Sequence, residues 1–408
     1  MAVDRLSSAL DEHVKGLESA GTAKGAETVV TGVKPAGGVR GPRFLLEGHG
    51  EKEFIRMNSN SYMGLGLHPD VIRAEEEATA RFGVGPGAVR FISGSYGPHL
   101  ELERGLAAFH RREAAMIFSS AYATVVSTLT PLVTEETVLV SDALNHNCII
   151  NAMRLARPAG KAIYAHNDLE ALERALEEWK GKATRAIVVT DGVFSMRGDH
   201  APLDRIMAIC ARHDGAYPEN VVCVVDDSHG VGAFGRTGRG TEEHTESPPV
   251  DILVGTLGKA FGVNGGYVTA NASIVRFLRE SAPMYIYSNP ITVGEAAAAL
   301  RALRIVDSPA GVERLERLRS LTRRFEEGLG RVGIETIPGE HPVVPLMIRD
   351  TARTRALVRY LFENGVLVTG LTYPVVPRGD EEIRTQVNAD HTEADIDHVL
   401  DLLGAYTG

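Results

Sequence analysis

Short apolar runs alternate with helical patterns from about residue 41 to residue 290, and this alternation constrains the fold more than any other feature of the chain. Segment 169–179 is charged on one side and apolar on the other, as in an amphipathic helix between two strands. The apolar runs occupy residues 115–118, 138–141, 186–190, 221–225, 252–255 and 267–270. Several of these runs are almost continuous Val, Ile or Leu, which is typical of strands buried on both faces. The pattern predicts an α/β fold with a mainly parallel sheet wrapped by helices.

The amino-terminal region departs from this alternation. Four apolar residues repeat there at helical spacing: Leu6, Leu10, Val14 and Leu17. They predict an amphipathic helix that buries its stripe on its own chain or on a partner subunit. A Gly-rich, loop-like stretch over residues 21–41 separates this helix from the main body.

The composition changes again after residue 290. Residues 291–330 are predicted to be mostly helical, with a break near Pro309. A strand over residues 343–348, a helix over 352–363 and a final helix from Glu393 indicate a smaller α/β unit. We therefore expect an N-terminal helix and connecting segment (1–55), a large domain (56–295) and a C-terminal small domain (296–408).

Composition excludes several classes of function. The 408 residues carry a formal charge of −10, which argues against nucleic acid as a partner because phosphate backbones attract concentrated Lys and Arg. No apolar run approaches the roughly 18 residues that a membrane span needs. The 3 cysteines show no spacing typical of a disulfide framework or a zinc site, so we expect a reducing, cytoplasmic location and no metal.

A single lysine stands among small residues directly after the predicted strand 252–255. Lys259 lies in the run Gly-Thr-Leu-Gly-Lys-Ala-Phe-Gly, where small neighbours leave room for a flat ring beside its amine. A partly buried lysine holds its proton less tightly and forms Schiff bases with aldehyde cofactors. A surface lysine in a Gly-rich turn is the alternative. The segment makes Lys259 the candidate anchor for pyridoxal 5'-phosphate.

A carboxylate ends another predicted strand. Asp226 follows the run 221–225, and the carboxyl ends of strands are where open α/β sheets bind ligands. Pyridoxal phosphate needs an anion against its pyridinium nitrogen, which Asp226 can provide unless it only caps a turn. His229 follows three residues later and can approach the phenolic oxygen of the same ring.

The phosphate and the ring need further groups. Ser119 and Ser120 follow a strand and open a helix-like run, so they suit either a phosphate site at a helix amino terminus or ordinary caps. Thr256 adds a second hydroxyl, and His146 offers an imidazole that can stack on a planar ring. Arg384 lies in a strand-like stretch, where its guanidinium can bind a substrate carboxylate or form an unrelated salt bridge.

These motifs, in this order, resemble the α-oxoamine synthases, a branch of the fold-type I pyridoxal-phosphate enzymes, over nearly the whole chain. Within the branch the resemblance is greatest to the 2-amino-3-ketobutyrate coenzyme A ligases, or glycine C-acetyltransferases. The matching stretches are Ser-Asp-Ala-Leu-Asn-His (141–146), Thr-Asp-Gly-Val-Phe-Ser-Met (190–196), Val-Asp-Asp-Ser-His (225–229), Gly-Thr-Leu-Gly-Lys (255–259), Tyr-Pro-Val-Val-Pro (373–377), Ile-Arg-Thr-Gln (383–386) and Ala-Asp-His-Thr (389–392).

The resemblance implies a role for each matching residue. Lys259 forms the Schiff base, Asp226 pairs the ring nitrogen, His146 stacks on the ring, and Ser195 and His229 lie near the phenolic oxygen. Backbone N–H groups of Ala121 and Tyr122 hold the phosphate together with Thr256, and Ser288 and Asn289 reach it from the other subunit of a homodimer. Asn60 and Arg384 hold the carboxylate of the amino acid.

The implied reaction condenses glycine with acetyl-CoA or another short acyl-CoA and releases coenzyme A. Lys259 removes the α-proton of the bound glycine, and His146 or His229 polarises the thioester oxygen. The product is a β-keto acid or, after loss of carbon dioxide, an α-amino ketone. Alanine or serine can replace glycine in this scheme.

Other readings stay open. The segment after Lys259 is one residue shorter than in the ligases and looks more like 5-aminolevulinate synthase. A decarboxylating condensation of that type, or of the 8-amino-7-oxononanoate synthase type, is one alternative. A pyridoxal-phosphate aldolase or aminotransferase, which would ignore acyl-CoA, is another, and a binding protein with a degenerate site is a third.

Overall fold

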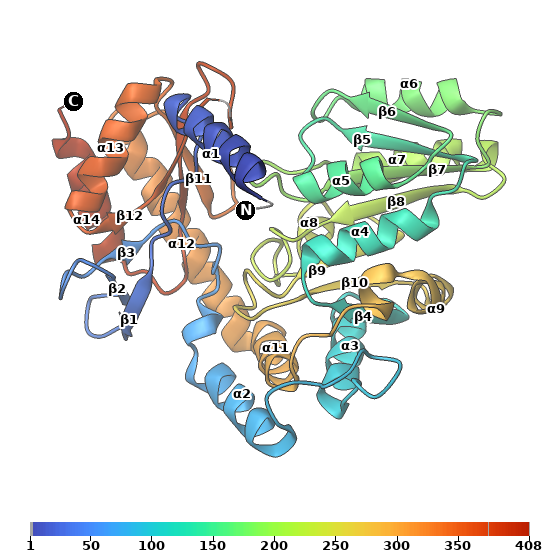
Figure 1. Ribbon diagram of the computed structural model, residues 1–408, viewed down its shortest axis with the longest axis horizontal. Helices are drawn as coiled ribbons and strands as arrows, with labels where there is room; N and C mark the ends of the chain where they lie inside the picture. The colour runs from blue at the N-terminus through green and yellow to red at the C-terminus, as the bar shows by residue number, and fades with distance from the viewer. Residues whose placement is uncertain (1–2, 374, 408) are drawn as a thin grey trace.

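A computed structural model describes residues 3–373 and 375–407 (Figure 1). Its centre is a sheet of seven strands in the order β4-β10-β9-β8-β7-β5-β6. The strands are β4 (Ala114–Phe118), β5 (Thr137–Asp142), β6 (Gly160–Tyr164), β7 (Arg185–Asp191), β8 (Val221–Asp226), β9 (Ile252–Thr256) and β10 (Gly266–Ala270). All six strands expected from the apolar runs are present. β6 was missed because it lies at the edge of the sheet and has alternating, partly exposed residues.

The sheet is mainly parallel, as predicted. β6, β5, β7, β8 and β9 pair in parallel, whereas β10 runs antiparallel to both β9 and β4. Alternate residues of the central strands enter different cores: Ala186 and Val188 of β7 face one core, and Ile187 and Val189 face the other. Burial on both faces explains the nearly continuous apolar composition of these strands.

Helices cover both faces of this sheet. α4 (Ala121–Leu132), α5 (Asn147–Leu155) and α9 (Ala272–Ser281) pack on one face. α3 (Gly97–Phe109), α6 (Leu169–Trp179) and α7 (Leu203–His213) pack on the other. The short helices α8 (Thr241–His244) and α10 (Pro283–Ile286) complete this part of the chain. The predicted helix over 169–179 is confirmed, and Asp168 caps it by accepting a hydrogen bond from the N–H of Ala171.

The predicted helices after residue 290 are α11 (Val293–Val306) and α12 (Pro309–Arg331), and they break at the expected proline. α11 packs against α3 and α2 (Pro69–Phe82). β11 (Val343–Met347), β14 (Glu382–Gln386) and β13 (Thr369–Leu371) form a second, antiparallel sheet in that order. α13 (Thr351–Glu363) and α14 (Glu393–Ala405) confirm the two remaining helices, and the domain boundaries stay a prediction.

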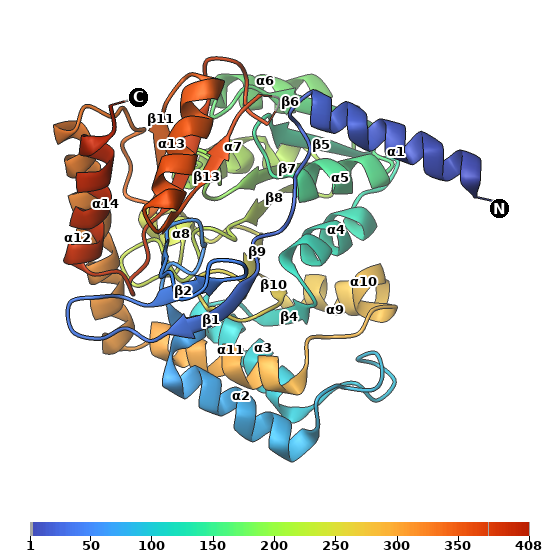
Figure 2. The same cartoon turned by 60° about the vertical axis from the view of Figure 1, so that its left-hand side comes forward.

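The amino-terminal region contributes to two small pairs of strands, whose labels lie together in Figure 1; β1 and β2 are the blue strands in Figure 2. β1 (Val30–Lys34) pairs with β2 (Arg43–Leu46), and β3 (Ile55–Arg56) pairs in parallel with β12 (Val366–Leu367). A single 3₁₀ turn, η1 (Leu65–Leu67), precedes α2, and another, η2 (Asp214–Ala216), precedes β8.

The predicted amphipathic helix is α1 (Asp4–Ser19). It buries none of its residues, and its four stripe residues are exposed in the single chain. The structure therefore contradicts burial of this stripe on its own chain, and burial on a partner subunit stays a prediction. Within the described part of the chain, no helix combines the length and apolar character needed to cross a bilayer.

Candidate active site

The carboxyl ends of the parallel strands meet at one edge of the large sheet, the position where open α/β sheets bind ligands. β7 ends at Asp191 and β8 ends at Asp226. A cavity at this edge is lined by Ala121, Tyr122, His146, Cys148, Asp191, Val193, Asp226, Ser228, His229 and Lys259. The fold thus brings together six of the residues that the sequence singled out and adds Cys148, Asp191, Val193 and Ser228.

Lys259 lies in the turn between β9 and β10. The turn is closed by hydrogen bonds from the N–H of Gly262 to the oxygen of Lys259 (2.9 Å) and from Leu257 to Gly265 (2.9 Å). Gly262 has a φ of +71°, and a β-carbon there would approach the nitrogen of Gly66 at 2.2 Å, so only glycine fits. Burial lowers the pKa of Lys259 to about 8, although Asp226 and Asp191 act in the opposite direction.

Two adjacent aspartates at the end of β8 have different surroundings because neighbouring strand residues point to opposite faces. Asp226 accepts hydrogen bonds from the N–H of Ser228 (3.1 Å) and the thiol of Cys148 (3.4 Å), and it faces the cavity. Asp227 points away and accepts from the hydroxyl (2.6 Å) and N–H (2.7 Å) of Thr241. Burial raises the pKa of Asp227 to about 7. The geometry therefore supports Asp226, the residue chosen from the sequence, as the partner of a ring nitrogen.

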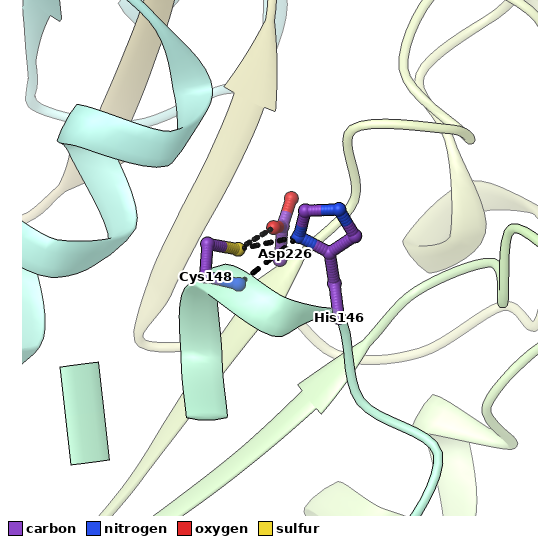
Figure 3. A group of neighbouring side chains, drawn as sticks. All are labelled: His146, Cys148 and Asp226. Atoms are coloured by element: carbon purple, nitrogen blue, oxygen red, sulfur yellow. Dashed lines mark hydrogen bonds between the residues drawn. The ribbon is translucent and has the colours of Figure 1, made fainter. Parts of the chain in front are cut away.

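His146 caps α5 beside Asp226 (Figure 3). Its Nδ1 accepts the N–H of Cys148 at 3.2 Å and lies 2.9 Å from the Cys148 sulfur. Burial lowers the pKa of His146, which favours a neutral ring suited to stacking. The ligand atoms of His146, Cys148 and Asp226 lie within 4.8 Å of one another, a spacing that a metal ion could also use. The absence of a metal stays a prediction.

The amino terminus of α4 forms the other end of the cavity. Ser120 caps this helix by accepting the N–H of Ala123 (3.1 Å). The N–H groups of Ala121 and Tyr122 have no acceptor among the described residues, and such groups bind phosphate well. A β-carbon on Gly266 would lie 2.3 Å from the nitrogen of Ala121, so glycine is required where β10 passes this helix end.

Three predicted phosphate contacts lie outside this cavity. The hydroxyl of Thr256 is used in the turn, where it donates to the oxygen of Gly265 (3.2 Å) and accepts from Gly258 (3.1 Å). Ser288 and Asn289 lie between α10 and α11, and neither lines the cavity. Their predicted role depends on a second subunit and stays a prediction.

The groups predicted to hold a substrate carboxylate form a connected network. Arg384 donates to the side chain of Asn60 (3.2 Å) and to the backbone oxygen of Ser195 (2.5 Å). Asn60 also accepts from the hydroxyl of Tyr62 at 3.1 Å, and that hydroxyl lies 2.7 Å from Nδ1 of His229. The structure therefore connects Arg384 with Asn60 and joins them to His229 through Tyr62, while their role in holding a substrate carboxylate stays a prediction.

Burial and nearby positive charge, first Lys259, hold the pKa of His229 well below its usual value. Its backbone oxygen accepts Nε2–H of His341 (2.9 Å), whose Nδ1 in turn accepts the N–H of Val343 (3.2 Å). Burial lowers the pKa of His341 to about 3, so this support for His229 is uncharged near neutrality. Sequence reasoning missed Tyr62 and His341, because each acts through a contact that is distant along the chain.

Two buried polar atoms of cavity residues lack partners among the described residues: Oδ1 of Asp191 and Oγ of Ser228. Burial raises the pKa of Asp191 well above its usual value, and its Oδ2 accepts the N–H of His146 at 3.1 Å. Buried polar groups normally have partners, so these atoms suit a site completed by a polar ligand. Together with the free N–H groups of α4, the amine of Lys259 and the carboxylate of Asp226, they fit pyridoxal phosphate.

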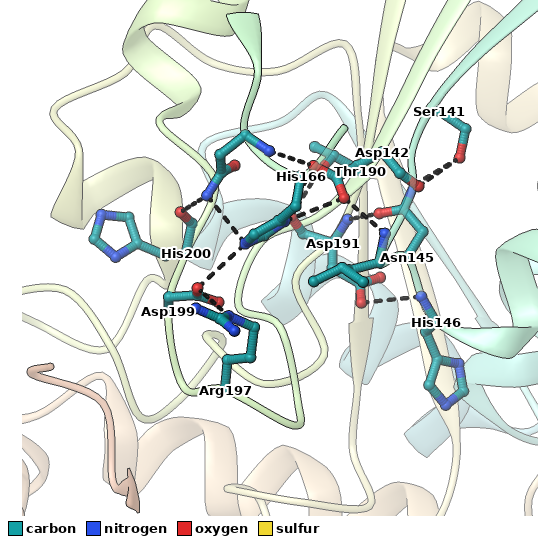
Figure 4. Close-up of polar contacts among 12 residues, drawn as sticks. Ser141, Asp142, Asn145, His146, His166, Thr190, Asp191, Arg197, Asp199 and His200 are labelled. Atoms are coloured by element: carbon teal, nitrogen blue, oxygen red, sulfur yellow. Dashed lines mark hydrogen bonds and ion pairs between the residues drawn. The ribbon is translucent and has the colours of Figure 1, made fainter. Parts of the chain in front are cut away.

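A second layer of contacts fixes the loops behind the cavity (Figure 4). The side chain of Asn145 accepts the N–H of Asp191 (2.8 Å) and donates to the oxygen of Val189 (2.8 Å). His166 lies between two carboxylates, 3.2 Å from Asp142 and 3.2 Å from Asp199. These contacts tie the loop that carries His146 to the loop that carries Ser195.

Comparisons with known proteins decide the family. The pattern of the family "Aminotransferase class I and II" matches residues 52–403. An 8-amino-7-oxononanoate synthase of Geobacter sulfurreducens is 39% identical over 369 residues, covering 90% of this chain and 92% of that protein. The enzyme of that name from Symbiobacterium thermophilum is 37% identical and covers 97% and 96%. The chain belongs to the α-oxoamine synthases.

Solved structures agree with this assignment. A structure of serine palmitoyltransferase from S. paucimobilis with a bound PLP–myriocin aldimine superposes with a TM-score of 0.86 at 26% identity, covering 99% of this chain and 97% of that one. The chain is thus a fold-type I enzyme whose cofactor is pyridoxal phosphate, as expected from its motifs. Its family joins an amino acid to an acyl thioester. The narrower resemblance to glycine C-acetyltransferases finds no specific support among these relatives, which carry the name of one of the alternatives.

Proposed function

We propose that this α-oxoamine synthase catalyses a decarboxylating condensation of the 8-amino-7-oxononanoate synthase type. That name describes a product whose amino carbon carries a methyl group and whose ketone ends a seven-carbon chain with a terminal carboxylate. An amino acid that contributes this amino carbon and methyl group is alanine, and the acyl donor is a heptanedioyl (pimeloyl) thioester. The relatives of this name, 36–39% identical over most of the chain, are the observation that carries the choice.

Lys259 is proposed to hold the cofactor and to take the α-proton of the amino acid. Its pKa of about 8 lies much closer to neutrality than the usual value for lysine, so about a tenth of the free amine is unprotonated at pH 7 and able to accept a proton. When bound, pyridoxal phosphate supplies an electron sink for the α-carbon, and Asp226 maintains the positive ring nitrogen that this requires. His146 covers the ring, and the N–H groups of Ala121 and Tyr122 hold the phosphate.

Arg384 and Asn60 are proposed to orient the amino acid through its carboxylate. Tyr62 fixes this pair relative to His229, and its phenol has one proton to donate. When Tyr62 donates to Asn60, Nδ1–H of His229 donates to the phenol oxygen and leaves Nε2 as an acceptor. A neutral His229 can then hold or pass a proton beside the reacting carbonyl.

The test is release of free coenzyme A by the cofactor-loaded protein, with product mass measured in parallel. Three pairs are compared: alanine with pimeloyl-CoA, glycine with acetyl-CoA, and serine with palmitoyl-CoA. Each thioester without an amine is the control. We expect fast release with the first pair and a product that has lost carbon dioxide. Preference for the second pair would support glycine C-acetyltransferase instead. Amine turnover that ignores every thioester would favour an aldolase or aminotransferase, and the Lys259→Ala variant serves as the blank.

The expected partner of the chain is a second copy of itself. The exposed stripe of α1 and the position of Ser288 and Asn289 outside the cavity both suit a homodimer with a shared site. The cytoplasmic location expected from the sequence likewise stays a prediction.

A further inference from the structure

An arginine without a carboxylate partner lies beside the proposed substrate site. Arg56 ends β3, and its backbone is held by β12 on one side, where the N–H of Ile55 donates to Gly365 (2.8 Å) and that of Met57 to Leu367 (2.9 Å). Its guanidinium lies over the ring of Phe44, with 4.5 Å to the ring centroid. The backbone of Arg56 and one face of its guanidinium are therefore held in place.

Hydroxyls are the polar partners of this guanidinium. Arg56 donates to the hydroxyls of Ser59 and Ser61, which also lie 2.7 Å from each other. Among the described residues, no carboxylate forms an ion pair with Arg56. Two other arginines do have carboxylate partners: Arg43 pairs with Asp395 (2.5 Å), and Arg314 pairs with Asp390. A half-buried charge normally has a charged partner, so Arg56 lacks a partner that a ligand can supply.

The position of Arg56 connects it to the reaction site. Arg56, Ser59 and Ser61 line a cavity of about 400 Å³ that also contains Asn60 and Gly258. Asn60 contacts Arg384, and Gly258 directly precedes Lys259. Val30 and Leu367 give the same cavity an apolar wall. Thr28 and Asn58 add polar groups, so the lining suits a ligand that carries one anionic group next to a short apolar stretch.

We propose that Arg56, supported by the hydroxyls of Ser59 and Ser61, binds an anionic oxygen group of the acyl donor and so selects that donor. The inference rests on the proposed function, in which an acyl thioester reacts beside Lys259. Two parts of such a donor carry the required chemistry: the terminal carboxylate of a heptanedioyl chain and the phosphates of coenzyme A. The planar guanidinium can bind either one through two parallel hydrogen bonds.

The test measures binding to the cofactor-loaded protein by calorimetry without any amino acid, so that no condensation occurs. Pimeloyl-CoA, heptanoyl-CoA, pimeloyl-pantetheine and heptanoyl-pantetheine separate the two anions from the apolar chain. Because a charged hydrogen bond contributes about 1.5–3 kcal/mol, we expect Arg56→Gln to weaken binding of the anion-bearing ligands by roughly 10- to 150-fold. Arg56→Lys, which keeps the charge but loses the fork, should recover part of this loss.

The pattern over the four ligands identifies the anion. Loss confined to the two pimeloyl ligands assigns Arg56 to the terminal carboxylate, and loss confined to the two CoA ligands assigns it to the phosphates. Equal loss for all four, no loss for any, or no binding of any ligand by the unmodified protein overturns the proposal. Arg40→Gln, at a nearby exposed arginine, is the matched control and should leave all four affinities unchanged.

Two further measurements distinguish the anion site from a folding defect and from the proposed reaction. If Arg56→Gln does not fold, the double variant Ser59→Ala with Ser61→Ala keeps the arginine and should show a smaller loss for the same ligand pair. No loss in that folded variant overturns the proposal. Intact anion-dependent binding without coenzyme A release from alanine and pimeloyl-CoA would refute the proposed function while leaving the anion site in place.

Discussion

His166 provides a direct test of the electrostatics behind the cofactor loops. Its imidazole lies between Asp142 and Asp199, 3.2 Å from each, and its side chain is 19% exposed (Figure 4). Burial opposes the charged form, but the hydrogen bonds that the imidazole donates to the two carboxylates outweigh it and raise the pKa of His166 to about 9. The folded protein therefore binds this proton more tightly than the unfolded chain does.

The size of the effect follows from linkage. Each tenfold change in proton affinity corresponds to about 1.4 kcal/mol, so an increase from 6.5 to about 9 amounts to about 3 kcal/mol of stability. Both states bind the proton below pH 6.5, where the contribution is complete. It is lost as the pH rises through 9, because the folded state then gives up the proton and its two ion pairs.

The perturbation is His166→Gln, and the assay is urea unfolding at several pH values between 6 and 10. The chain has 1 tryptophan, and Trp179 ends α6, the helix that follows His166, so its fluorescence reports on this region. The substitution lowers the free energy of unfolding. We expect this loss to be about 3 kcal/mol larger at pH 6 than at pH 10. His13→Gln, on exposed α1, controls for replacing a histidine. A stability difference between variant and unmodified protein that does not change with pH would refute the reasoning.

Three further predictions test the site. Asp227→Asn should lower the free energy of unfolding, measured in urea, by about 1–3 kcal/mol, because it disturbs the buried hydrogen bonds to Thr241. Cofactor affinity of the folded protein should stay unchanged. A selective loss of cofactor would contradict the assignment of Asp227 to the fold and Asp226 to the cofactor. Gly266→Ala should weaken cofactor binding, measured by equilibrium dialysis, because the added β-carbon displaces the N–H of Ala121; unchanged affinity would remove α4 from the phosphate site. Labelling of Lys259 in the cofactor-free chain by pyridoxal phosphate and borohydride, followed on its own peptide by mass spectrometry, should rise with a midpoint near pH 8; a midpoint near 10 would contradict the burial of this amine.

Local sequence determined the framework and part of the site. Apolar runs that are buried on both faces predicted six strands of the large sheet, and polar residues directly after them predicted the cavity. Lys259 and Asp226 were found because each lies at or just after the end of such a strand, and parallel strand ends meet at one edge. His146 was likewise found from its position after a strand, whereas Ala121 was assigned through the family resemblance. Strand period and helix capping act over a few residues, so sequence is enough for them.

Tertiary structure decided which groups touch. Tyr62 and His229 are 167 residues apart, and their contact depends on how the amino-terminal region folds onto the sheet. Arg56 looks like any strand arginine in the sequence, and only packing shows that hydroxyls and an aromatic ring surround it without a carboxylate. The pKa of Lys259 and the division between Asp226 and Asp227 depend on burial and on the direction in which each side chain points. Such properties arise from contacts between distant segments, whereas the pattern of a sequence records only the neighbours along the chain.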